Sequence, residues 1–134
     1  MSAAPGHPER DNISYSFPKE ERLHSKKLIT ELFSKGSSFN LYPLRFVYLT
    51  NPEPVSTPPQ ILVSVSKKYF KKAVDRNRIK RQMREAYRLQ KPFFFLNNSF
   101  KIYTLAIIYI GKEKNPFNII RKKLNSGLER LQGN

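Results

Sequence analysis

The chain has 134 residues, and its 25 lysines and arginines outnumber its 10 aspartates and glutamates, which gives a formal net charge of +15 at pH 7. This length suits one domain with its own core, and 39% hydrophobic and 13% aromatic residues argue against a disordered basic tail. The sequence has no cysteine, which excludes disulfides and thiolate metal sites. A folded chain of this charge points to an anionic partner, nucleic acid first and an anionic membrane second.

The compartment and the metal content follow from what the sequence lacks. No apolar run reaches the roughly 18 residues needed to span a bilayer, and the opening segment MSAAPGHPERDN has no apolar stretch like that of a secretory signal. The two histidines, His7 and His24, show no metal-ligand spacing with other residues. We expect a cytoplasmic protein with no membrane partner and no metal site of its own.

The N-terminal part of the chain predicts a tail and then a helix. Residues 1–14 are small, polar and proline-containing, so we expect a disordered tail before a single domain over residues 15–134. In SFPKEERLHSKKLITELFSKG, Ser25 is suited to cap a helix that Gly36 would stop. The apolar residues of this helix recur at helical spacing and would share one face, namely Leu28, Ile29, Leu32 and Phe33.

The remaining segments alternate between strands and helices. FNLYPLRFVYLTN (39–51) and ILVSVS (61–66) predict strands separated by a proline-rich loop. A basic helix is expected from Val74 to Gln90, and the segment KPFFFLNNS after Gln90 would end it. The segment KIYTLAIIYI (101–110) predicts a strand buried on both faces. Asn115 and Pro116 would open a last helix with one apolar stripe: Phe117, Ile120, Leu124, Leu128 and Leu131. The order is helix, strand, strand, helix, strand, helix, with room for one more short strand, which predicts an α+β fold.

The basic helix carries its charge on two stripes. At about 100° per residue, one outward stripe comprises Asn77, Arg81, Arg84 and Arg88. A second stripe, of Arg76 and Lys80, runs beside an apolar face formed by Ile79, Met83 and Ala86, with Tyr87 at its margin. Such a face is also compatible with plain solvation. However, Asp75 and Glu85 are too few to compensate ten cations between Lys67 and Arg88, so we favour a phosphate-bearing partner.

The kind of nucleic acid is indicated by what surrounds the helix. A DNA recognition helix normally belongs to a helix-turn-helix unit or a dimer, whereas this helix follows a strand directly. The sequence therefore favours a folded RNA. Two alternatives remain. One is a general or ribosome-associated RNA-binding protein, and the other, ranked after it, is a DNA-binding regulator.

The segment VSKKYFKKAVDRNRIKRQMREAYRL (65–89) resembles the signature of the bacterial ribonuclease P protein subunit. The similarity lies in Arg76-Asn77-Arg78, in Ile79-Lys80-Arg81 and in Arg84-Glu85, and it extends over residues 15–132. It implies one small sheet of about four strands packed with three helices in the order α-β-β-β-α-β-α. It also implies a left-handed strand–helix–strand crossover like that of a small-subunit ribosomal protein domain, against the usual preference.

The resemblance also implies a function. The protein would join the catalytic ribonuclease P RNA as a monomer in a holoenzyme of one RNA and one protein. That holoenzyme would cleave the 5′ leader from precursor tRNA as an endoribonuclease. The RNA would carry the chemistry and would require Mg²⁺, so that the protein would hold no cofactor and no catalytic residue. This agrees with a sequence that offers no histidine pair or carboxylate cluster for phosphodiester hydrolysis.

The same resemblance assigns site residues. The residues that would bind the catalytic RNA are Lys67, Lys68, Asn77, Arg78, Arg81, Arg84 and Arg88. Those that would bind the leader, in a cleft between the first helix and the sheet, are Ile29, Phe33, Val47, Ser64, Arg76 and Lys80. Many members carry an aromatic residue at the position of Ile29, so contact there would be apolar. For Ile29, Phe33 and Val47, core packing is the alternative. No role follows for Phe93-Phe94-Phe95, where we expect the end of the basic helix to pack onto the sheet.

Overall fold

The computed structural model describes residues 17, 19–53, 58–94 and 101–132, so the expected tail over residues 1–14 lies outside it. Three α-helices, one 3₁₀ helix and four strands make up the described part of the chain. In chain order these elements are η1 (Lys19–Glu21), α2 (Lys26–Lys35), β1 (Ser37–Leu41), β2 (Leu44–Thr50), β3 (Gln60–Val65), α3 (Ala73–Phe94), β4 (Ile102–Tyr109) and α4 (Phe117–Gln132).

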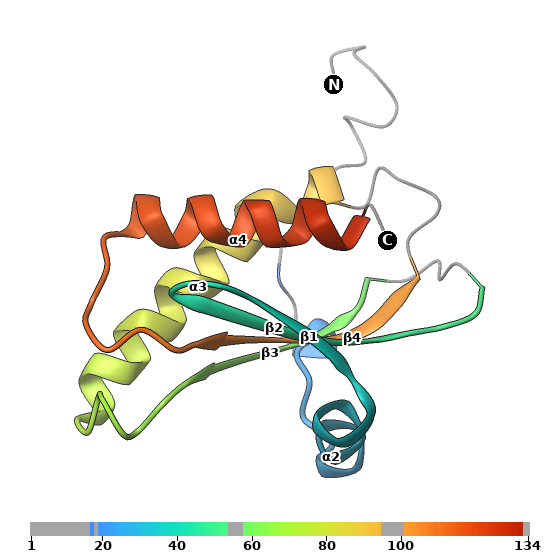
Figure 1. Ribbon diagram of the computed structural model, residues 1–134, viewed down its shortest axis with the longest axis horizontal. Coiled ribbons are helices and arrows are strands. Elements are labelled where there is room, and N and C mark those ends of the chain that lie inside the picture. The colour runs from blue at the N-terminus through green and yellow to red at the C-terminus, as the bar shows by residue number, and fades with distance from the viewer. Residues whose placement is uncertain (1–16, 18, 54–57, 95–100, 133–134) are drawn as a thin grey trace.

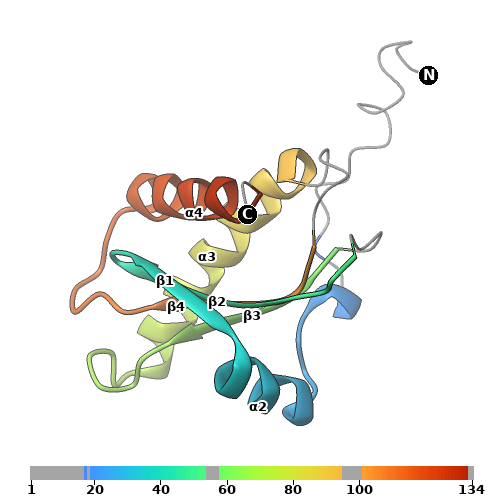
Figure 2. The same cartoon turned by 45° about the vertical axis from the view of Figure 1, so that its right-hand side comes forward.

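The strands form one mixed sheet in the order β1-β2-β4-β3. β1 and β4 both pair antiparallel with β2, while β3 and β4 run parallel and are connected by α3. Figures 1 and 2 show α2 on one side of the sheet and α4 on the other. The α+β class and the order α-β-β-β-α-β-α are therefore confirmed.

Each face of the sheet has its own core, because successive side chains of a strand point to opposite faces. Leu105, Ile107 and Tyr109 of β4 belong to the larger core, together with buried residues of α3 and α4. Ala106 and the partly buried Ile108 belong to a smaller core with α2. The prediction that this strand is covered on both faces is confirmed.

The first predicted strand is wrong in one respect, since residues 39–51 form two strands. β1 and β2 make a hairpin with Leu41 opposite Leu44, and its turn contains a cis peptide between Tyr42 and Pro43. Proline has no N–H to donate to a ladder, which is why an uninterrupted strand through Pro43 is not formed. The hairpin accounts for the extra short strand.

The ends of α2 were predicted correctly. The Ser25 hydroxyl accepts a hydrogen bond of 3.3 Å from the Leu28 amide, and the Gly36 amide donates to the Leu32 carbonyl at 2.9 Å. These bonds satisfy a donor at the start and an acceptor at the end of the helix.

The end of α3 was predicted wrongly, because the helix continues past Gln90 to Phe94 with Pro92 inside it. Proline removes a backbone hydrogen bond and disfavours a helix interior. Here tertiary contacts hold the end: Pro92 is buried, and the Gln132 side chain of α4 donates to the Phe93 carbonyl at 3.4 Å. Phe95 lies outside the described residues.

The predicted apolar stripe of α4 is confirmed. Ile120, Leu124, Leu128 and Leu131 are buried, and Phe117 packs against the same core. Gly127 lies on this face directly over the Phe46 ring, which a β-carbon at this position would overlap. The missing side chain of Gly127 thus lets α4 sit close to the sheet.

Candidate nucleic-acid interface

The outward stripe of α3 lines a hollow of about 390 Å³. We call this hollow the basic hollow, and its lining residues are Asn77, Arg81, Arg84, Glu85 and Arg88 from α3, with Phe17 and Arg22 from the segment before α2. The four residues expected on one stripe, Asn77, Arg81, Arg84 and Arg88, therefore do share one surface. Arg22 adds a positive charge from outside the helix.

Arg22 is held in place by several contacts. Its guanidinium donates to the Phe17 carbonyl at 3.3 Å and lies 5.1 Å from the centre of the Phe17 ring. That ring packs against Tyr87 with 5.2 Å between centroids. Arg22 also forms a parallel bridge with Ile61, and the Leu23 amide donates to the Ile61 carbonyl at 2.8 Å. Arg22 was not predicted as a site residue, because it lies outside every helix whose periodicity could place it on this surface.

The electrostatics of the basic hollow favour an anion. Partial burial, with a smaller contribution from the charge of Arg22, lowers the pKa of Arg84, although an arginine stays protonated in a protein. Like charges held together out of bulk water repel, and a phosphate group between them would relieve that repulsion.

The two acids near α3 are paired more fully than the sequence predicted. Arg88 forms a bidentate pair with Glu85, with distances of 2.9 Å from Nε and 2.7 Å from Nη2. This hydrogen bonding lowers the pKa of Glu85 and raises that of Arg88. Asp75 pairs with Lys114 of the β4–α4 connection at 2.9 Å. Both acids are thus paired with cations, but a clear excess of positive charge remains.

Three further predicted contacts to the catalytic RNA lie near the start of α3. Lys67 and Lys68 are exposed in the turn after β3, where the Lys68 amide donates to the Ser66 hydroxyl at 3.1 Å. Arg78 is exposed in the first turns of the helix. These three residues do not line the basic hollow, so only part of the predicted set for the catalytic RNA is brought together there.

The second stripe of α3 is half-buried. Arg76 donates from one guanidinium nitrogen to the carbonyls of Phe70 and Lys71, at 2.8 Å each. Arg76 therefore closes the loop before its own helix. Among the described residues, neither Arg76 nor Lys80 lines the basic hollow or the cleft described next.

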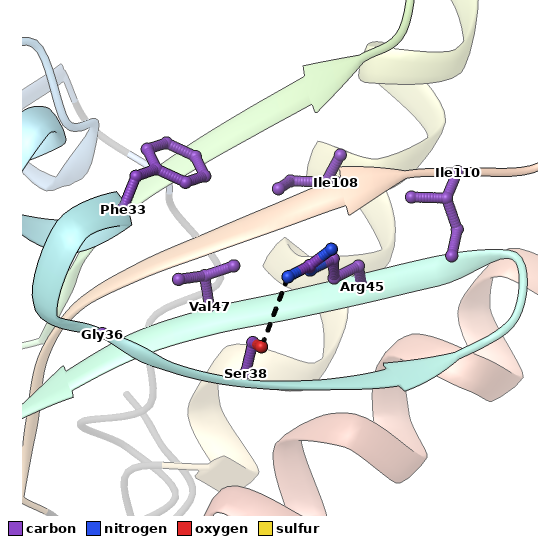
Figure 3. Close-up of a pocket in the computed structure, with 7 residues that line it drawn as sticks. All are labelled: Phe33, Gly36, Ser38, Arg45, Val47, Ile108 and Ile110. Atoms are coloured by element: carbon purple, nitrogen blue, oxygen red, sulfur yellow. Dashed lines mark hydrogen bonds between the residues drawn. The ribbon is translucent and has the colours of Figure 1, made fainter.

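A cleft of about 290 Å³ lies on the other side of the sheet, beside the C-terminal end of α2. Figure 3 shows its lining residues: Phe33, Gly36, Ser38, Arg45, Val47, Ile108 and Ile110. The Phe33 ring is 49% exposed, whereas Val47 is only 5% exposed. Arg45 is exposed and donates to the Ser38 hydroxyl at 3.4 Å. The cleft therefore combines an apolar floor, an open aromatic ring and a cation.

The predicted leader-binding residues relate to this cleft in different ways. Phe33 and Val47 line it. Ser64 is in register with Ile108, which is in register with Arg45, so the three form one row across the same sheet face. Ile29 is half-buried and packs against the smaller core, which agrees with core packing, the alternative given for this residue in the sequence analysis. Arg45 was missed, and its signal was a lone arginine between apolar residues of a strand.

The described part of the chain has neither a metal-binding cluster nor a membrane-spanning helix. It contains no group of three or more histidine, cysteine, aspartate or glutamate side chains placed to hold a metal ion. None of its helices combines the length and apolar character needed to cross a membrane.

The fold and the two sites define a small α+β protein. The basic hollow of α3 lies on one side of its sheet, and a cleft lined largely by apolar residues lies on the other. A family model described as Ribonuclease P matches residues 17–132. The ribonuclease P protein component of Porphyromonas gingivalis is 38% identical over 125 residues, covering 90% of each chain. That of Chlorobium phaeobacteroides is 35% identical over 122 residues, covering 82% of this chain and 84% of the relative.

Solved structures agree on the fold. The ribonuclease P protein of Thermotoga maritima superposes with a TM-score of 0.65 at 24% identity, covering 81% of this chain and 96% of that one. The protein of Staphylococcus aureus gives a TM-score of 0.63 at 22% identity, covering 82% and 94%. The chain belongs to the ribonuclease P protein family, whose members are protein subunits of the tRNA-processing endoribonuclease ribonuclease P.

Proposed function

We propose that this chain binds the catalytic ribonuclease P RNA through α3 and its surroundings, and binds the 5′ leader of precursor tRNA in the cleft beside α2. It would thereby assist the Mg²⁺-dependent removal of the leader. The observation that carries the proposal is the presence of two separate surfaces, one rich in arginine and one with an apolar floor, on a chain of this family.

The basic hollow is suited to the phosphates of a folded RNA. Arginine presents a planar fork of donors that matches phosphate oxygens, and Arg22, Arg81 and Arg84 are gathered around one depression. Lys67, Lys68 and Arg78 would extend this contact at the start of α3. An RNA surface of irregular shape can meet such a spread of cations, because RNA is recognised largely by shape and backbone.

The cleft is suited to a single strand of varied sequence. The exposed ring of Phe33 offers a stacking surface, Val47 and Ile108 give an apolar floor, and Arg45 can neutralise a phosphate. Ser64 of β3 lies beside Ile108 in the row that these two residues form with Arg45 across the sheet. We assign Ile29 to an apolar contact at the edge, and Arg76 and Lys80 to leader phosphates beyond the cleft.

The division of labour leaves the chemistry to the RNA. Mg²⁺ held by the RNA would activate water and stabilise the leaving oxygen. The protein would position the leader and the RNA, as a monomer with one RNA in the cytoplasm, with no catalytic residue and no cofactor of its own.

The test is cleavage of precursor tRNA at low Mg²⁺, with a bacterial ribonuclease P RNA present or absent. Stimulation only when RNA and protein are both present is the expected result. Cleavage by the protein alone would overturn the assignment of chemistry to the RNA. Binding of many RNAs without stimulation would instead favour a general RNA-binding protein.

The two surfaces can be separated by substitution. Arg81→Ala with Arg84→Ala should weaken assembly with the catalytic RNA, whereas Lys80→Ala should leave assembly intact and raise the concentration of precursor tRNA required. Arg121→Ala with Lys122→Ala removes the same charge from exposed positions of α4 and serves as the control. Equal loss of assembly in all three variants would show that net charge alone matters.

A further inference from the structure

Two exposed tyrosines lie at one end of the sheet and are both in contact with Lys112. Tyr42, in the β1–β2 turn, is 59% exposed, and Tyr69, between β3 and α3, is 38% exposed. Lys112, which follows β4, links them: its amide donates to the Tyr42 hydroxyl at 3.3 Å, and its ammonium lies 5.9 Å from the centre of the Tyr69 ring. The Lys68 ammonium lies 5.4 Å from the same ring. We call these four residues, Tyr42, Tyr69, Lys68 and Lys112, the tyrosine platform.

We propose that the tyrosine platform binds unpaired nucleotides of the leader, with bases stacked on Tyr69 and Tyr42 and phosphates neutralised by Lys112, while Lys68 at its border keeps its proposed contact with the catalytic RNA. Exposed aromatic rings beside cations are the usual means of holding a single strand, because every base has a face that can stack. The two lysines already lie over the Tyr69 ring, and their flexible stems allow each ammonium to move to a phosphate when a base takes its place.

Hydrogen bonds and an ion pair hold the backbone segments that carry the platform. The Ile110 amide donates to the Pro43 carbonyl at 2.8 Å, which fixes the hairpin turn to the end of β4. The Tyr109 hydroxyl donates to the Glu113 carbonyl and accepts from the Asn115 side-chain amide at 2.7 Å, and Lys114 pairs with Asp75 of α3. A preordered backbone loses less entropy when a ligand binds. Exposed tyrosines on a fixed backbone are therefore suited to binding.

The charge around the platform suits RNA. Lys67, Lys71 and Lys72 are also exposed in the β3–α3 connection. The acids nearby along the chain are Glu113, which is exposed, and Asp75, which is already paired with Lys114. The excess of lysine favours a polyanion over a neutral or basic peptide.

The position of the platform identifies the source of the strand. Figures 1 and 2 show the β1–β2 turn, the β3–α3 connection and the β4–α4 connection at the same end of the sheet. The cleft extends toward this end through Arg45 and Ile110, and Ile110 is only two residues before Lys112. A strand leaving the cleft past Ile110 would reach the platform. This inference rests on the proposed function, because it takes the occupant of the cleft to be the leader.

The test uses the complete holoenzyme and two substrates, precursor tRNA with a long single-stranded leader and the same tRNA without a leader. Tyr69→Ala should weaken binding of the first substrate roughly five- to one-hundred-fold, as expected for the loss of one stacked base, and should leave the second unchanged. Tyr69→Phe should retain most of the affinity, because phenylalanine still stacks. Phe93→Ala removes an exposed ring from the far end of α3 and should change neither.

Crosslinking gives a second readout that does not depend on affinity. A photoreactive nucleotide placed along the leader should label the wild-type platform and lose that label in Tyr69→Ala. Unchanged affinity and labelling in that variant would overturn the inference. Weakened assembly with the catalytic RNA in the absence of substrate would also overturn it, by assigning the platform to that RNA. Failure of the wild-type protein to assemble at all would instead count against the proposed function.

Discussion

The Lys91 ammonium lies 2.6 Å from a carboxylate oxygen of Glu21, and the two side chains are only 6% and 17% exposed. This ion pair joins the last part of α3 to η1, the 3₁₀ helix that ends directly before Arg22. A charge removed from water is stable only with its partner. The pair therefore fastens the segment that brings Arg22 to the basic hollow.

Replacing Lys91 with methionine should lower the free energy of unfolding by about 3–5 kcal/mol, because the Glu21 carboxylate is left without its partner charge. Urea titration followed by circular dichroism measures the change. The double variant Glu21→Gln, Lys91→Met should regain part of the loss, since no lone charge remains. Lys114→Met breaks a more exposed pair and should cost less. A double variant as unstable as the single one would contradict this account.

Gly127→Ala should destabilise the protein through a single added methyl group. The new β-carbon would overlap the Phe46 ring, so α4 must move away from the sheet or the ring must leave its position. Overpacking of this kind typically costs about 1–3 kcal/mol, despite the higher helix propensity of alanine. Ser126→Ala, at the exposed neighbouring position, is the control and should be neutral or stabilising. Thermal unfolding of both variants makes the comparison.

The features that were predicted correctly depend on local sequence. The Ser25 cap and the Gly36 stop each rely on a hydrogen bond that spans one helical turn. The stripe of α4 and the outward stripe of α3 follow from helical periodicity alone. Such signals need no knowledge of the rest of the chain.

The features that were missed depend on contacts between distant residues. Pro92 predicts a helix end. The helix continues because Lys91 forms an ion pair with Glu21 and the Phe93 carbonyl accepts a hydrogen bond from the Gln132 side chain. Arg22 reaches the basic hollow because Ile61 and Phe17 hold it there. Arg45 lines the cleft because of the register between β2 and β4. Periodicity within one segment carries no information about such pairings.

Glu85→Gln should strengthen binding to the catalytic RNA. The carboxylate holds Arg88 in a bidentate pair, and its removal ends the competition between Glu85 and phosphate for this guanidinium and takes one negative charge from the basic hollow. The salt dependence of assembly should steepen by about one unit of slope, as expected for one more phosphate contact. Glu129→Gln removes a charge from an exposed position of α4 and should leave the slope unchanged. The same slope in both variants would mean that Arg88 takes no part in binding.

Arg76→Ala and Lys80→Ala should differ in their effects on folding. Arg76 donates to the carbonyls of Phe70 and Lys71 and so holds the loop before α3, whereas Lys80 makes no such bond within the described residues. Loss of two charge-assisted hydrogen bonds should reduce the unfolding midpoint of Arg76→Ala. Lys80→Ala should unfold like wild type and lose only affinity for the leader. Calorimetry and leader binding, measured on the same samples, separate the two effects.

Phe33→Ala and Leu32→Ala test neighbouring positions of α2 with opposite environments. Phe33 is 49% exposed at the cleft, whereas Leu32 is completely buried in the smaller core. Removal of the Phe33 ring should weaken binding of leader-bearing precursor tRNA several-fold, with little change in stability, since the stacking surface is lost. Leu32→Ala should cost about 2–5 kcal/mol of stability through the cavity it creates, and should affect substrates with and without a leader alike. If Phe33→Ala also weakened binding of tRNA that lacks a leader, the ring would not be a leader contact.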